Sequence, residues 1–134
     1  MRPELERLAL GCSTISFAGR LEGEELWSRL GAADVLLVPS RQEGWGLVVN
    51  EAMAAGLPVI VSDCVGCIDD LVIDSSGTVV QTGDITGMAI AMRNHVKQPE
   101  KRREQSVVAR KIIAPWTTEN WAKNITQAWE HALR

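Results

Sequence analysis

The chain has 134 residues, of which 46% are hydrophobic, enough for one domain with one core over residues 1–134. Its net charge of −3 and pI near 5.4 argue against a broad basic surface for nucleic acid. No apolar run reaches membrane-spanning length, and the charged first residues are unlike a signal peptide. With three cysteines and no export signal, we expect free thiols and a cytoplasmic location.

The first part of the chain alternates between helical and strand patterns. A helix is predicted over residues 4–10 and a short strand over residues 14–18. Apolar side chains share one face of a second predicted helix, over residues 24–33. Residues 35–38 form a continuous apolar run that ends at Pro39, as in a strand covered on both faces. This last pattern indicates a parallel sheet.

The rest of the chain continues this alternation. Two further short strands are predicted over residues 59–61 and 77–80. Three helices follow, and their starts are signalled by capping residues or by a proline at the first helical position: Asp84, Pro99, and Thr117 or Thr118. Strands that alternate with helices predict an α/β fold with a Rossmann-like, doubly wound parallel sheet.

Several side chains late in the sequence are predicted to be structural. Trp116, Trp121 and Trp129 are interpreted as packing anchors rather than ligand platforms. His95 and His131 lie late in predicted helices, where the helix dipole favours their positive charge. The helix that begins at Pro99 is predicted to have a solvated basic face, with contact to anionic lipid as an alternative. That face consists of Lys101, Arg102, Arg103, Arg110 and Lys111.

The stretch from Ser40 to Ile60 predicts a strand exit, a glycine turn, a short helix and the next strand. A glycine on each side of Trp45 lets the backbone come close to a ligand. A helix starting near Leu47 would direct its free N–H groups and positive dipole end toward the same space. Glu43 and Glu51 bracket the turn and the start of this helix.

The two glutamates have a plain interpretation as solvated surface charges. However, ligands in open α/β sheets bind at the carboxyl ends of the strands, where Glu43 is predicted to lie. Glu51 would lie about 6 Å along the helix axis beyond Leu47. A carboxylate there can accept hydrogen bonds from two vicinal hydroxyls. The pattern fits a ligand with phosphates at the helix start and a sugar one turn further on.

Cys64 and Cys67 form a rival signal, because a CxxC motif between a strand and a helix is typical of redox proteins. The plain interpretation is two small residues in a turn. Zinc binding is disfavoured, since Cys12 is remote and a fourth ligand is missing.

Residues 43–60 resemble the donor-site signature of retaining GT-B glycosyltransferases of family four. The flanking residues 17–19, 32–40, 77–80 and 83–84 are similar to the same family, so the resemblance covers nearly the whole chain. It implies the C-terminal, nucleotide-sugar-binding domain of such an enzyme. It also places a glycine at position 67, which disfavours a redox role for Cys67.

The resemblance also implies roles for individual residues. Glu43 would contact the transferred sugar and act in catalysis, and Glu51 would bind the ribose hydroxyls. Arg20 and Leu21 would lie near the base. The sugar and the diphosphate would be held by the backbone of Gly44, Trp45, Gly46, Leu47 and Val48. The family needs no bound metal, and no cofactor is expected besides the nucleotide diphosphate sugar as donor substrate.

The sequence departs from the family pattern near its start. Gly19-Arg20-Leu21 is followed by Glu22, Glu24 and Glu25, where the family has a lysine that balances the diphosphate charge with the arginine. We therefore interpret residues 14–18 as the third strand, with the first two strands and the N-terminal acceptor domain missing. This leaves a gap beside the strand at residues 35–38, to be closed by a partner fragment, by strand exchange between copies, or by direct pairing.

The leading functional prediction is the donor-binding part of a retaining hexosyltransferase in polysaccharide biosynthesis. The complete enzyme would move a hexose from a nucleotide diphosphate sugar to a saccharide or lipid-linked acceptor. One alternative is a non-catalytic nucleotide-sugar binding or interaction module, or a truncated product that needs a partner chain; another is a thiol-redox protein. The expected location is cytoplasmic, with peripheral contact at the inner face of the membrane as an option.

Overall fold

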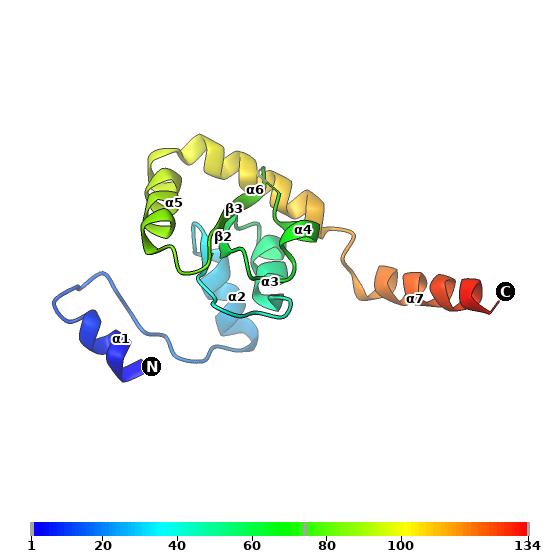
Figure 1. Ribbon diagram of the computed structural model, residues 1–134, viewed down its shortest axis with the longest axis horizontal. Coiled ribbons are helices and arrows are strands. Elements are labelled where there is room, and N and C mark those ends of the chain that lie inside the picture. The colour runs from blue at the N-terminus through cyan, green and yellow to red at the C-terminus, as the bar shows by residue number, and fades with distance from the viewer. Residues whose placement is uncertain (1, 74, 134) are drawn as a thin grey trace.

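The computed structural model describes residues 2–73 and 75–133, and its centre is a three-stranded parallel sheet. The strands are β1 (Leu36–Val38), β2 (Val59–Ser62) and β3 (Gly77–Val80), in the order β1-β2-β3 (Figure 1). In the register of the sheet, Ile60 of β2 pairs with Leu37 on one side and with Thr78 on the other. The parallel strands predicted over residues 35–38, 59–61 and 77–80 are therefore confirmed.

Helices pack on both faces of the sheet because the side chains of β2 alternate between them. Val59 and Val61 contribute to the cluster formed with α3 (Leu47–Ala55) and α6 (Pro99–Ile113). Ile60 belongs to a separate cluster with α5 (Ile85–Lys97). This arrangement confirms the predicted α/β, doubly wound fold.

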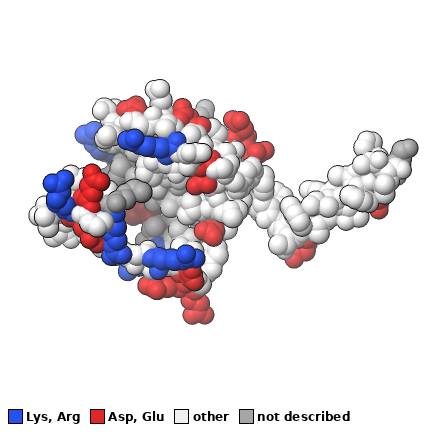
Figure 2. Space-filling view, turned by 60° about the horizontal axis from the view of Figure 1, so that its bottom comes forward, with Lys and Arg blue, Asp and Glu red and all other residues white. Residues whose placement is uncertain are grey.

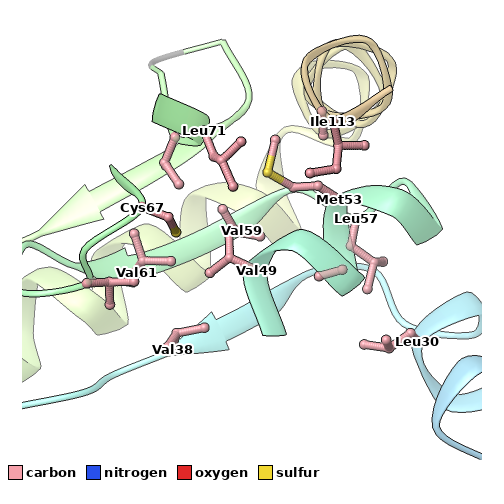
Figure 3. Packing of buried hydrophobic residues seen from close by; sticks show 14 residues of the cluster. Leu30, Val38, Val49, Met53, Leu57, Val59, Val61, Cys67, Leu71 and Ile113 are labelled. Atoms are coloured by element: carbon pink, nitrogen blue, oxygen red, sulfur yellow. The ribbon is translucent and has the colours of Figure 1, made fainter. Parts of the chain in front are cut away.

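The larger core cluster lies on the α3 and α6 face of the sheet. Met53 of α3 is fully buried, and Figure 3 shows it beside Ile113 of α6 and Val59 of β2. Two further helices add Leu30 and Leu71 to this cluster. They are α2 (Gly23–Gly31) and α4 (Ile68–Leu71).

The predicted helix starts are confirmed by the capping contacts. The Gly87 backbone N–H donates to Oδ1 of Asp84 at 2.8 Å, and Pro99 occupies the start of α6. At the last helix, α7 (Thr118–Ala132), the Asn120 backbone N–H donates to Oγ1 of Thr117 at 3.2 Å. Side chains that accept from free N–H groups in the first turn explain why these helices begin where they do.

The strand predicted over residues 14–18 does not form. The chain begins with α1 (Arg2–Leu8), and residues 14–18 are exposed and irregular, with Ile15 51% and Phe17 38% accessible. A strand needs a hydrogen-bonded neighbour, and within the described residues β1 pairs only with β2. Direct pairing of residues 14–18 with β1 is therefore wrong for this chain. Pairing with a partner fragment or a second copy stays a prediction.

The helix α7 lacks the packing that its apolar stripe predicts. It projects from the body in Figure 1, and none of its described residues is buried. Trp121 is 68% and Trp129 is 69% exposed, so their prediction as packing anchors is wrong within this chain. The helix is amphipathic, but its apolar stripe is not buried against any described part of the chain. In Figure 2 the visible face of α7 is mostly uncharged.

None of the described helices has both the length and the apolar character to span a membrane.

Candidate functional site

The turn that follows β1 is held against the loop that follows β2. Glu43 forms a parallel bridge with Val65, which continues the pairing of the two strands beyond the sheet. The Cys67 backbone N–H donates to the carbonyl oxygen of Trp45 at 3.0 Å. Both contacts lie at the carboxyl ends of parallel strands, where α/β sheets bind ligands. Partly buried Glu43 is thereby fixed by backbone pairing on both sides of the turn.

Two glycines allow these segments to approach each other closely. Gly46 has a φ of +93°, and a Cβ atom there would lie 2.7 Å from Cγ1 of Val65. A Cβ atom on Gly66 would lie 1.9 Å from the carbonyl oxygen of Gly44, a backbone atom that cannot move aside alone. The sequence predicted the glycines around Trp45, but it did not single out Gly66. Its contact with Gly44 joins segments that are far apart in sequence.

The helix α3 begins at Leu47 with its first turn open. Its N-cap is Gly46, and no described side chain accepts a hydrogen bond from the free N–H groups. Such groups and the helix dipole together attract an anion. Leu47 itself is 69% exposed. The prediction that a helix N-terminus faces the space beside the glycine turn is therefore met by the geometry.

The side chain of Trp45 is fixed by two contacts. Its Nε1–H donates to Oδ1 of Asn50 at 3.0 Å, which supplies the partner that a buried indole N–H needs. Its ring lies 5.6 Å from that of Trp116, centroid to centroid, with planes tilted by 38°. Asn50 and Trp116 were not predicted as site residues. The requirement for an indole partner was the signal that could have pointed to Asn50.

Glu51 shares its surroundings with Trp116 of this tryptophan pair. It lines an open hollow of about 570 Å³ together with Trp27 of α2, Arg110 of α6 and Trp116. Glu43 is not among the residues that line this hollow. The two glutamates thus belong to one turn-and-helix unit but face different surroundings, with aromatic and basic side chains near Glu51. That setting suits a ligand that carries both rings and negative charge.

The structure does not join Arg20 and Leu21 to this unit. The side chain of Arg20 is 89% exposed and pairs with Glu22 at 2.5 Å, Nε to Oε1. Among the described hydrogen bonds and ion pairs, none links either residue to the turn or to α3. Their assignment near a base stays a prediction.

The two cysteines of the CxxC motif differ in exposure, since Cys64 is partly buried and Cys67 is buried. Burial raises the pKa of the Cys67 thiol, and the negative charges of Asp70 and Glu43 raise it further. The Cys64 thiol donates to the carbonyl oxygen of Ser40 at 3.1 Å. The attacking thiol of a redox site needs access and a low pKa. Cys67 has neither property, so the thiol-redox alternative stays a prediction without support from this side chain. No cluster of three or more metal-binding side chains occurs among the described residues.

Comparison with known families decides what this arrangement belongs to. The family model of glycosyl transferases, group 1, matches residues 2–112. The chain belongs to this family. The resemblance inferred from residues 43–60 is thereby confirmed, and the chain is a glycosyltransferase domain of the GT-B C-terminal type.

Individual relatives show how much of a glycosyltransferase the chain represents. It is 34% identical to the sulfoquinovosyl transferase of Arabidopsis thaliana, over 75% of this chain and 20% of that protein. It is 33% identical to the D-inositol 3-phosphate glycosyltransferase of Corynebacterium urealyticum, over 96% of this chain and 31% of that protein. The chain thus spans about a fifth to a third of the length of these relatives.

Solved structures agree with this assignment. Sucrose-phosphate synthase from Thermosynechococcus elongatus matches with a TM-score of 0.86 and 30% identity, over 98% of this chain and 34% of that one. TarM matches with a TM-score of 0.69 at 24% identity, which supports the fold alone. The fold is therefore shared with sucrose-phosphate synthase over almost the whole of this chain.

Proposed function

We propose that the chain is the donor-binding part of a retaining glycosyltransferase that moves a hexose from a nucleotide diphosphate sugar to a saccharide or lipid-linked acceptor. The observation that carries this proposal is the uncapped start of α3 beside a glycine turn at the carboxyl ends of β1 and β2. Free N–H groups and a positive dipole end at a helix start can stabilise the negative charge that develops on a departing diphosphate.

The proposal gives each residue of the unit one task. Glu43, fixed beside Val65, contacts the transferred sugar, and Glu51, one turn into α3, accepts hydrogen bonds from the ribose hydroxyls. The sugar and diphosphate are held by the backbone of Gly44, Trp45, Gly46, Leu47 and Val48. The rings of Trp27 and Trp116, which line the hollow with Glu51, add an apolar surface near the nucleotide.

Nucleotide binding to the full chain tests the role of Glu51. Calorimetric titration with UDP and with GDP identifies the base that binds, and the same nucleotide is then titrated into Glu51→Gln. We expect about a tenfold loss of affinity, because charge-assisted hydrogen bonds to the ribose become neutral ones. Glu104→Gln, an exposed change on α6, is the matched control and should bind as the parent does. Equal affinity of Glu51→Gln and Glu104→Gln would refute the ribose assignment.

We also propose that donor binding needs no metal ion. The free N–H groups at the start of α3 supply positive potential that a cation would otherwise provide. Addition of EDTA should leave the affinity for the nucleotide unchanged. A loss of affinity that is restored by Mg²⁺ or Mn²⁺ would contradict this part of the proposal.

The acceptor half of the reaction is assigned to a further domain or partner chain. Two features support this: no described strand pairs with the edge of β1 away from β2, and none of the described residues of α7 is buried. An interaction module without catalysis is the second candidate, favoured by the same features. Transfer assays on the chain alone and with an added acceptor-binding chain separate the two. With this role we propose a cytoplasmic location and peripheral contact with the membrane. Flotation with lipid vesicles tests the membrane contact.

A further inference from the structure

A second, smaller pocket lies between α5 and α6, beside Thr78 of β3. Its volume is about 140 Å³, and His95, Lys101, Arg102 and Gln105 are among its lining residues. Because one water molecule occupies about 30 Å³ in the liquid, the pocket has room for a small polyatomic ion. None of the described residues that line it is acidic.

His95 is the unusual member of this pocket. Its side chain lines the pocket, the residue is only 6% exposed, and Nδ1 is buried without a hydrogen-bond partner among the described residues. Burial lowers the pKa of His95, and the positive charges of Arg102 and Lys101 lower it further. The prediction that His95 gains charge from the helix dipole is therefore wrong. A buried polar ring beside two cations would be stabilised by negative charge in the pocket.

The walls of the pocket are held in place. Nη1 of Arg102 donates to the carbonyl oxygen of His95 at 2.9 Å, and its Nη2 lies 3.1 Å from Oδ1 of Asp34. Gln105 is 3% exposed, and its Nε2 donates to the carbonyl oxygen of Gly77 at 3.3 Å. Asp34 is largely exposed, so it offsets only part of the local positive charge. Lys101 makes no described ion pair and leaves its charge available.

We propose that this pocket binds a small tetrahedral oxyanion, either inorganic phosphate or the phosphoryl group of a phosphorylated metabolite. Lys101 and Arg102 supply the positive charge, and His95 gains a negatively charged neighbour inside the pocket. The site is separate from the proposed donor site at α3, so it offers a way for a phosphate-bearing compound to bind without competing for the donor. Phosphate binding at this pocket does not depend on the proposed transfer reaction.

Histidine NMR on the full chain tests this proposal, because the sequence contains only His95 and His131. Sodium phosphate is titrated at several pH values, with sodium chloride of matched ionic strength as the reference. We expect the His95 ring signals to shift saturably and its pKa to rise with phosphate. His131, exposed on α7, should not respond. Equal responses of the two histidines, or none at His95, would overturn the proposal.

Two lysine variants distinguish a built site from general charge attraction. Lys101→Ala should weaken the phosphate response of His95 about tenfold, the effect of one lost charge-assisted contact. Lys97→Ala removes the same charge from the end of α5, outside the pocket lining, and should change the response little. Similar losses in both variants would overturn the proposal.

The source of the phosphoryl group is identified by a parallel titration with a hexose phosphate. Tighter binding of the hexose phosphate assigns a phosphorylated metabolite, and tighter or equal binding of inorganic phosphate assigns the free ion. A chain carrying Glu51→Gln should keep the full His95 response. Thus unchanged nucleotide affinity in Glu51→Gln would refute the donor proposal and leave the phosphate proposal standing. Loss of the His95 response would refute the phosphate proposal alone.

Discussion

The body of the protein, over residues 23–113, and its two terminal segments use similar apolar side chains with opposite outcomes. Val59, Ile60 and Val61 of the body are fully buried, whereas Leu8 is 71% and Trp129 is 69% exposed. In the body, the apolar side chains of β2 meet those of α3 and α6 on one face of the sheet and Ala91 of α5 on the other, so burial is mutual there. In α1 and α7 the stripes have no such counterpart among the described residues. Amphipathic pattern alone therefore produces a helix, and only a partner surface produces a core.

The sharpest way to break the body is at the contact between the two site loops. Gly66→Ala places a Cβ atom 1.9 Å from the carbonyl oxygen of Gly44, so one loop must move. We expect destabilisation of about 4 kcal/mol or more, in the range reserved for such steric conflicts. Urea unfolding followed by circular dichroism measures it.

Gly44→Ala is the matched control for that change, because a Cβ atom there meets nothing within 4 Å. Both variants add one methyl group to the same pair of loops. Gly44→Ala should change the free energy of unfolding by less than about 1 kcal/mol. If Gly66→Ala unfolds at the same urea concentration as Gly44→Ala, the backbone contact does not hold the loops together.

Two truncations to alanine, one in the body and one in α7, compare how much each region contributes to the free energy of unfolding. Met53→Ala should cost about 2–5 kcal/mol, because it leaves a cavity between α3, β2 and α6. Trp121→Ala removes a larger side chain from α7 but should cost less than about 0.5 kcal/mol, since Trp121 is 68% exposed. Unfolding in urea compares the two. A large loss from Trp121→Ala would show that α7 folds back onto the body in solution.

The body could be predicted from the sequence because its signals are local. The apolar run at residues 35–38 ends at Pro39, and a helix C-cap at Gly56 separates α3 from β2, so the element limits are readable. The family signature likewise occupies one continuous stretch. Residues 14–18 have the composition of a strand, but strand formation depends on a neighbour that composition does not reveal.

The contacts that complete the candidate site were harder to predict because they join distant segments. Gly66 meets Gly44, and Trp116 meets Trp45, across 22 and 71 positions of the sequence. Only three-dimensional packing brings such pairs together. His95 shows the same limit: its place late in α5 is readable from the sequence, whereas its burial against β3 and α6 is not.

The pH dependence of stability gives the mildest test of the difference between body and terminus. The pKa of His95 is lowered in the folded chain, and in the unfolded chain it is near 6.5. Above that value both states are neutral and the folded chain has its full stability. As the pH falls below 6.5, the unfolded chain takes up a proton first, so stability declines until the pH passes the folded pKa.

His95→Gln should remove this decline between about pH 7 and pH 5.5, a window above the range in which carboxylates titrate. A hydrogen bond from Thr82 lowers the pKa of Asp63, and a backbone hydrogen bond of Glu119 lowers the pKa of that carboxyl. Their protonation therefore reduces the stability of the folded chain only at lower pH. His131→Gln on exposed α7 should leave the decline unchanged. Melting temperatures measured across the window decide the matter. If His131→Gln flattens the curve and His95→Gln does not, then α7 is the buried element in solution and the contrast between body and terminus is reversed.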